Sequence, residues 1–166
     1  MDIRASRPAD VDAIYAIVND AAQAYKGVIP ADCWHEPYMR MDELAHEIAD
    51  GIRFWVGEED GRPLGVMGIQ DKGDVALVRH AYVPTALQRK GVGSQLLRHI
   101  EKLAAKPILI GTWKDASWAI SFYQRHGYTL VSEPQKEALL RKYWSIPLRQ
   151  IETSVVLADR RYASAR

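Results

Sequence analysis

One short segment combines hydrogen-bond donors with small residues where a helix is predicted to begin. It consists of Gln88, Arg89, Lys90, Gly91, Val92, Gly93 and Ser94. The first amides of a helix have no intrahelical partner and carry partial positive charge. The two glycines allow a ligand to approach the backbone closely, and the Arg and Lys add positive charge. The segment therefore predicts a phosphate or pyrophosphate site.

Other phosphate-binding motifs fit this segment less well. A Walker loop needs G-x-x-x-x-G-K-[ST], and the chain has none. A dinucleotide-binding turn needs a third glycine where Leu96 stands, and no acidic residue follows at the required distance on the next strand. The alternative without a ligand is an ordinary loop that leads into a helix.

Two titratable side chains elsewhere are of types that catalyse proton transfer. Tyr123 lies in a segment of helical periodicity, where a tyrosine is either a general acid or a packed core residue. His80 lies in an apolar run, where a histidine is either a general base or a packed side chain. On a regular strand Ala81 and Val83 point to one face, and His80 and Tyr82 point to the other.

The elements that must position these residues follow from the periodicity of apolar side chains. Strands are predicted at 2–6, 52–59, 64–69, 75–83, 108–113, 128–131 and 151–157. Helices are predicted after Pro8, after a cap at Asp42, over 92–104, after a cap at Asp115 and over 134–144. The order β-α-α-β-β-β-α-β-α-β-α-β predicts an α/β protein with a mixed, mostly antiparallel sheet and helices on both faces.

Composition excludes several classes of protein. The 166 residues suit one domain, which we place at 1–158, followed by a basic tail at 159–166 that we expect to be loose. A net charge of +1 gives no reason to expect nucleic acid or a membrane as a partner. The single cysteine, Cys33, and the lack of a long apolar run favour a cytoplasmic protein. No metal-ligand motif occurs, so no metal is expected.

The chain resembles the GNAT superfamily of acyl-CoA-dependent N-acyltransferases over about residues 2–157. Gln88–Gly93 matches the family's Q/R-x-x-G-x-G/A pyrophosphate loop at every position. Downstream, Ala119-Ile120-Ser121-Phe122-Tyr123 followed by Gly127-Tyr128 is similar to the family's A-I-x-F-Y-x-x-x-G-F/Y segment. The order of the predicted elements agrees with the family's as well.

The resemblance implies an N-acetyltransferase that uses acetyl-CoA and a primary amine, which attacks the thioester directly. Backbone groups of Ala81, Tyr82 and Val83 would hold the pantetheine arm, Gln88–Ser94 the pyrophosphate, and Ala119 would add a contact. Tyr123 would protonate the leaving thiolate, a transfer that is uphill by about 1.5 pKa units at reference values. His80 is the candidate base. If Arg79 occupies the acceptor side instead, the base would be a water chain, or the acceptor would carry an acidic group. His35, Glu36 and Glu43 are further candidate bases.

The chain departs from the family at two places. Ala116 stands where many members have an asparagine that contacts the donor, and Pro84 directly follows Val83. In the family the acceptor is selected by loops that correspond to residues 25–40 and 132–146, both rich in aromatics here. The alternatives are a non-catalytic acyl-CoA-binding module and transfer of a longer acyl group. Cys33 is more typical of packing than of an acyl carrier, and a homodimer would be ordinary for the family.

Overall fold

The computed structural model describes residues 1–164, which form two units, each compact in itself. Unit 1 consists of Met1–Ala24, His35–Asp71 and Val78–Ala104. Unit 2 consists of Tyr25–Trp34, Lys72–Leu77 and the chain from Ala105 onward. Each unit thus draws on several stretches of the sequence. Strand β4 (Ala76–Tyr82) begins in a segment of unit 2 and ends in a segment of unit 1.

The strands of unit 1 follow the order β1-β2-β3-β4, with antiparallel pairing of β1 with β2 and of β2 with β3. The bounds of the first three are β1 (Asp2–Ala5), β2 (Arg53–Glu59) and β3 (Arg62–Asp71). The turn between β2 and β3 places Asp60 at a φ of 50° and Gly61 at a φ of 74°. A two-residue hairpin turn of this kind needs positive φ at both central residues, which explains the Asp-Gly pair.

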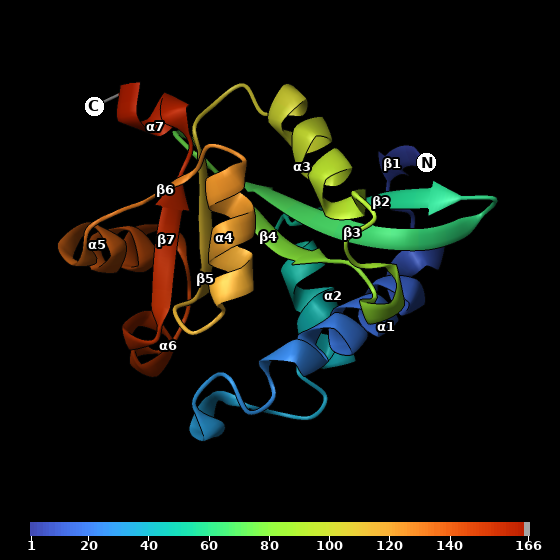
Figure 1. Cartoon of the computed structure of the whole chain (residues 1–166), viewed down its shortest axis with the longest axis horizontal. Helices are drawn as coiled ribbons and strands as arrows, with labels where there is room; N and C mark the ends of the chain where they lie inside the picture. Colours follow the sequence, from blue (N-terminus) through green and yellow to red (C-terminus); the bar gives the residue numbers. More distant parts are fainter. Residues whose placement is uncertain (165–166) are drawn as a thin grey trace. The chain divides into compact units, whose positions relative to one another are not determined.

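Helices cover both faces of this sheet (Figure 1). They are α1 (Val11–Ala22), α2 (Met41–Ala49) and α3 (Val92–Leu103). Phe54 of β2 packs in one cluster with Leu44 of α2 and with apolar side chains of α1. The next residue, Trp55, points to the opposite face, where its ring lies 4.7 Å from that of His99 on α3. The alternation of β2 side chains therefore separates the two helical layers.

Unit 2 is built on three antiparallel strands in the order β5-β7-β6. Their bounds are β5 (Ile108–Trp113), β6 (Thr129–Leu130) and β7 (Ser154–Ala158). The helices of this unit are α4 (Ser117–Arg125), α5 (Glu133–Tyr143), α6 (Leu148–Glu152) and α7 (Arg160–Ser164). Leu140 of α5 packs against Leu109 of β5 and Val156 of β7 in one buried cluster. The helices and the seven strands confirm the predicted α/β class with a mostly antiparallel sheet.

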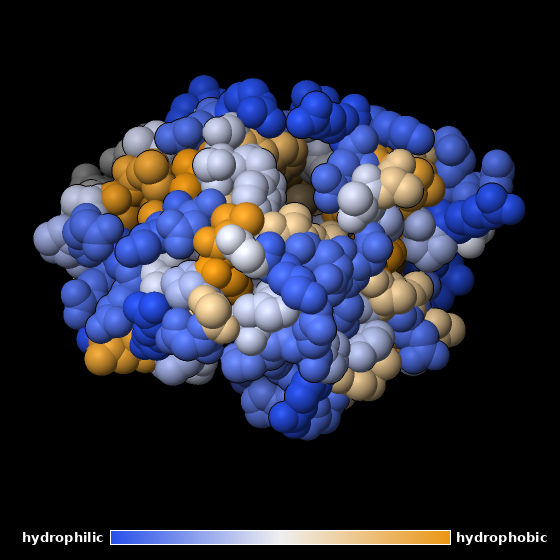
Figure 2. All heavy atoms as spheres, turned by 60° about the horizontal axis from the view of Figure 1, so that its bottom comes forward, coloured by the Kyte–Doolittle hydropathy of each residue, from blue (hydrophilic) through white to orange (hydrophobic). Residues whose placement is uncertain are grey.

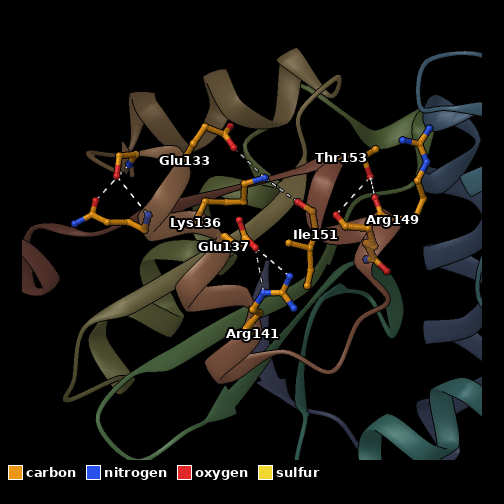
Figure 3. A network of polar contacts seen from close by, with 10 residues as sticks. Glu133, Lys136, Glu137, Arg141, Arg149, Ile151 and Thr153 are labelled. Carbon is orange, nitrogen blue, oxygen red and sulfur yellow. Dashed lines mark hydrogen bonds and ion pairs between the residues drawn. The ribbon is translucent and has the colours of Figure 1, made fainter.

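The strand predicted over 151–157 is wrong in its first residues, because α6 extends to Glu152. Figure 3 shows a contact at the C-terminal end of this helix. Lys136 of α5 is buried and donates from Nζ to the carbonyl oxygen of Ile151 at 2.8 Å. A cation at a helix C-terminus satisfies a carbonyl that has no intrahelical partner. Ile151 is a buried residue of this helix. Its apolar side chain was assigned to a strand because the periodicity of so short a segment fits a strand and a helix equally well.

Two predicted helix caps are also wrong. Arg40 occupies the N-cap of α2, and Asp42 instead pairs with the Arg40 guanidinium. Ala116 occupies the N-cap of α4 in place of Asp115. The N-cap residues of both helices make no side-chain capping bond, although Oδ1 of Asp42 accepts from the amide of Glu43 at 3.0 Å within the first turn of α2. The amides at the start of α4 are therefore not satisfied by a side-chain cap, although the sequence offers Asp115 as one.

The basic end of the chain is more ordered than expected. Residues 160–164 form α7, and Tyr162 packs against the buried cluster of unit 2. Residues 165–166 of the predicted tail lie outside the described residues. No helix within residues 1–164 is long and apolar enough to cross a membrane. Figure 2 shows a face that is mostly hydrophilic, with separate small hydrophobic areas.

Candidate active site

His80, near the end of β4, has left-handed backbone although the strand continues to Tyr82. Its φ is 55°, in the left-handed region, which costs a residue with a Cβ about 1–2 kcal/mol. The His80 ring stacks with Phe54 at 6.0 Å and with Tyr82 at 6.3 Å, on the side covered by α1 and α2. The Val83 side chain lies over Gly65, together with Val92 of α3. His80 and Tyr82 therefore point to one face of the sheet and Val83 to the other, as predicted, and His80 faces the layer of α1 and α2.

Glu47 of α2 contacts two consecutive residues of β4. Its Oε2 pairs with Nε2 of His80, and its Oε1 lies 3.2 Å from a terminal nitrogen of Arg79. The Glu47 side chain is 18% exposed and that of His80 is 14% exposed. The other terminal nitrogen of Arg79 donates to Oε1 of Gln70 at 3.3 Å. A mostly buried carboxylate thus joins an imidazole to a guanidinium.

The two carboxylates of α2 have shifted pKa values of opposite sign. Burial raises the pKa of Glu47, but the contact with His80 and the charge of Arg79 outweigh it, so the net pKa is lowered. Partial burial and the neighbouring Glu47 charge raise the pKa of Glu43, which lies one turn earlier on α2. Glu43 was one of the alternative bases, and the nearby His80 lowers its pKa by a smaller amount than burial raises it. The exposed residues His35 and Glu36 lie in the segment between α1 and α2.

The Gln88–Ser94 segment forms the turn into α3, as predicted. The chain leaves β4 through a short helical turn whose first amide, that of Thr85, donates to Oδ2 of Asp20 on α1 at 2.8 Å. The Gln88 side chain then donates back to the carbonyl oxygen of Val83 at 3.3 Å. Asp20 was not identified from the sequence, because nothing local links α1 to this turn.

Left-handed backbone shapes the rest of this turn. Arg89 has a φ of 65° and Gly91 a φ of 82°, and Gly91 is the N-cap of α3. No side chain caps the helix, so by helix geometry the amides of its first turn have no intrahelical partner. The residues from Gln88 to Gly91 are exposed. Free amides at a positive helix end, beside the exposed side chains of Arg89 and Lys90, make an arrangement that can hold an anion.

Tyr123 lies in unit 2, in the last turn of α4. The side chain is buried, and its ring meets Phe122 at 5.1 Å and Tyr128 at 6.0 Å, both edge to face. Burial raises the pKa of Tyr123 well above its ordinary value. The hydroxyl is therefore protonated at neutral pH, as a general acid requires, while transfer of its proton is harder than reference values suggest. Ala119 lies one turn earlier and is half-buried.

The structure brings most of the predicted site residues into unit 1. Arg79 to Val83 and the Gln88–Ser94 segment form the end of β4 and the turn into α3, while Tyr123 and Ala119 belong to unit 2. Glu47 was missed, although its spacing of four from Glu43 puts both carboxylates on one face of a helix. Within residues 1–164 no group of three or more His, Cys, Asp or Glu side chains is arranged to hold a metal ion.

Some aromatics of the two predicted acceptor loops serve packing. Tyr25 is buried and stacks on Trp118 at 6.0 Å, and Tyr143 is buried in the core of unit 2 with its hydroxyl 2.7 Å from Asp74. The loop that follows Tyr25 is also tied to α6, since Arg149 donates to Asp32 at 2.8 Å. These contacts support the interpretation that both aromatic side chains seal the core beneath long loops.

Comparison with known proteins agrees with this geometry. A family model described as an acetyltransferase (GNAT) domain matches residues 50–130. Peptidyl-lysine N-acetyltransferase YiaC from Escherichia coli (strain K12) is 25% identical over 131 residues, which are 78% of this chain and 84% of that protein. The match to the family model includes both the turn into α3 and Tyr123.

Solved structures share the fold. The PaiA N-acetyltransferase of Thermoplasma acidophilum, in complex with coenzyme A, has a TM-score of 0.70 and 16% identity, covering 96% of this chain and 99% of that one. The yncA protein of Salmonella typhimurium, with its cofactor acetyl-CoA, has a TM-score of 0.62 and 24% identity, covering 80% of this chain and 81% of that one.

Proposed function

We propose that this chain, whose residues 50–130 match the model of the acetyltransferase (GNAT) domain, transfers an acetyl group from acetyl-CoA to a primary amine. The observation that carries the proposal is the turn into α3, where Arg89 and Gly91 are left-handed and no side chain caps the helix. That turn suits a pyrophosphate, whose charge complements the free amides of a helix start. Acetyl-CoA in the yncA structure and coenzyme A in the PaiA structure support this choice of donor.

In this proposal the chain holds the donor through three groups of residues. Amides of the Gln88–Ser94 segment bind the pyrophosphate, and the charges of Arg89 and Lys90 add to the attraction. Backbone groups at Ala81, Tyr82 and Val83 hold the pantetheine arm, and Ala119 adds a contact. When bound, the donor supplies an activated acyl group as a thioester.

Two side chains move protons in the proposed reaction. His80 accepts the proton that the acceptor ammonium must lose before its nitrogen can attack. As the new C–N bond forms, the C–S bond breaks and the thiolate takes a proton from the Tyr123 hydroxyl. The raised pKa of Tyr123 keeps this proton in place until the negative charge of the leaving group develops.

The acceptor is proposed to be a primary amine of the lysine type. The YiaC protein is named as a peptidyl-lysine N-acetyltransferase, and it covers 78% of this chain at 25% identity. A lysine ammonium is protonated at neutral pH, which is why the reaction needs a base such as His80. The alternative is a module that binds acyl-CoA without turnover. It is favoured by Ala116, which offers no side-chain contact at the start of α4.

The first test is thermal unfolding with and without acetyl-CoA. A donor at a hundred times its Kd adds about 2.7 kcal/mol to the free energy of unfolding, or about 5–11 °C for a domain of this size. Gly91→Glu should abolish this rise, because it places a negative charge where the pyrophosphate binds. The matched control is Gly61→Glu, at another exposed left-handed glycine of unit 1, and it should keep the rise.

Thiol release with a panel of amines then separates the two candidate functions. Turnover with a lysine-containing peptide or a small amine supports the transferase. A rise of the unfolding midpoint without turnover of any amine supports the binding module. A midpoint that saturating acetyl-CoA leaves unmoved would refute the proposal for the donor.

A further inference from the structure

We propose that Glu47 is a positioning residue for His80, which fixes the imidazole so that it can accept a proton from the acceptor amine. The inference rests on the proposed role of His80 as the base. Glu47 itself does not touch the acceptor in this proposal, and it acts only through the histidine.

The contact sets which ring nitrogen of His80 is available. Glu47 Oε2 pairs with Nε2, so the carboxylate favours the tautomer that carries its proton on Nε2. The lone pair of Nδ1 is then the one that accepts a proton. A carboxylate that holds one ring nitrogen and thereby orients the other for proton transfer is the logic of catalytic histidines in general. The stacking of the His80 ring with Phe54 and Tyr82 restricts its rotation further.

The backbone at this point is held in a conformation that it would not adopt on its own. His80 has a φ of 55°, and such strain persists only where the surroundings impose it. Gly68 of β3 is one cause, since a Cβ there would lie 2.7 Å from the carbonyl oxygen of Arg79. The absence of that Cβ admits the carbonyl, and Glu47 contacts the side chains of both Arg79 and His80. Strained residues held in this way are found mostly at functional sites.

A chain of hydrogen bonds fixes the helix that carries Glu47. Arg79 donates to Oε1 of Gln70, and Nε2 of Gln70 donates to the carbonyl oxygen of Asp50 at 3.1 Å, at the C-terminal end of α2. Gln70 is 2% exposed, so breaking this chain would leave buried polar atoms unpaired. Arg79 of β4 therefore contacts α2 in two ways, directly through Glu47 and indirectly through Gln70 of β3 and the carbonyl of Asp50. Glu47 is held on a rigid element, as an orienting residue must be.

The test is a double-mutant cycle in the full chain, read as kcat and KM for acetyl-CoA with a lysine-containing peptide. His80→Gly removes the imidazole, and glycine suits the left-handed backbone at that position. Glu47→Gln keeps the size of the side chain and removes its charge. We expect Glu47→Gln to lower kcat about 10–100-fold, the usual effect of losing an orienting partner, with KM values changed less than about threefold. In the His80→Gly background the same substitution should change kcat less than about threefold, because the residue through which it acts is gone.

Two further variants keep the test decisive. Asp42→Asn removes another carboxylate of α2, whose side chain is 67% exposed, and it should leave kcat unchanged. Glu47→Asp keeps the negative charge but moves it away from His80, because the side chain is one methylene shorter, so we expect a smaller loss of kcat. This variant also serves if Glu47→Gln does not fold. A loss of kcat in Glu43→Gln but not in Glu47→Gln would overturn the proposal in favour of Glu43.

The outcomes also separate this inference from the proposed function. If His80→Gly keeps the parent kcat, the assignment of the base fails and the inference fails with it. If His80→Gly loses kcat while Glu47→Gln does not, the inference alone is refuted. If Glu47→Gln is equally costly in both backgrounds, Glu47 acts by a route other than His80, and the positioning role is refuted.

Discussion

Replacing Gly91 by alanine tests whether the left-handed turn at the start of α3 is responsible for donor binding. Gly91 has a φ of 82° and a ψ of 5°. A Cβ there would have only Nε2 of Gln95 nearby, at 3.9 Å. The substitution therefore causes no collision, and its whole effect is conformational. Left-handed backbone costs a residue with a Cβ about 1–2 kcal/mol.

This cost should appear in the affinity for acetyl-CoA. The turn is exposed, so the variant relaxes to an ordinary φ when no donor is bound, and binding must restore the turn. An affinity loss of 1–2 kcal/mol corresponds to about 5–30-fold in Kd. At a hundred times the parent's Kd, acetyl-CoA adds about 2.7 kcal/mol to the free energy of unfolding of the parent and about 0.9–1.8 kcal/mol to that of the variant.

The matched control is Gly61→Ala. Gly61 also has a positive φ, 74°, with open space around a Cβ, but the pairing of β2 with β3 holds its turn in place. Here the strain cannot relax, so the unliganded midpoint should fall by about 2–8 °C while the rise caused by acetyl-CoA is kept. Thermal unfolding and titration calorimetry measure both quantities. A Gly91→Ala protein that binds acetyl-CoA as tightly as the parent would refute the argument that the left-handed turn shapes the donor site.

Three further predictions concern a proton donor, an ion pair and a buried cation. Tyr123→Phe should lower kcat by about 10²–10⁴-fold in the thiol-release assay, and an unchanged kcat would rule out the general-acid role. Arg4 lowers the pKa of Asp10 to about 2, so the pair stabilises the fold above pH 4, and this contribution, about 1–2 kcal/mol, is lost as the pH falls towards 2. Asp10→Asn should therefore flatten the decline of the free energy of unfolding between pH 4 and pH 2 in urea titrations, and parallel curves would contradict this. Lys136→Met leaves the buried carbonyl of Ile151 without its donor and should cost about 1–3 kcal/mol in urea, whereas Glu133→Gln, at a side chain that is 80% exposed, should cost under about 0.5 kcal/mol.

The turn into α3 was accessible from the sequence because its structure is local. The glycine at 91 and the apolar spacing from Val92 to Ile100 concern residues within a few positions of one another. Helix starts depend on such neighbours, so the end of the loop, the start of the helix and its free amides were all predicted. The same holds for the Asp60-Gly61 hairpin. These features predicted the fold class and a turn that suits an anion.

For short segments with ambiguous periodicity, only the tertiary structure showed which secondary structure they form. Residues 151–153 alternate as a strand would, yet they end α6, where Lys136 reaches the carbonyl oxygen of Ile151. Near the end of the chain, Tyr162 packs against a buried cluster. The basic composition of this segment led us to expect a loose tail, because composition does not reveal such a contact. In each case a contact with a distant segment outweighs a weak local preference.

By itself the sequence determined the order of the seven strands and of helices α1 to α5, and the donor-rich turn at Gln88–Ser94, because backbone geometry and hydrogen bonds between near neighbours decide them. Only the tertiary structure decided the surroundings of His80. Its left-handed φ is not a preference of histidine, and it follows from the space at Gly68 and from the packing of α2 on the end of β4. The contact with Glu47 joins residues far apart in the chain. No local pattern specifies such a contact, because it exists only after the helix has packed on the sheet.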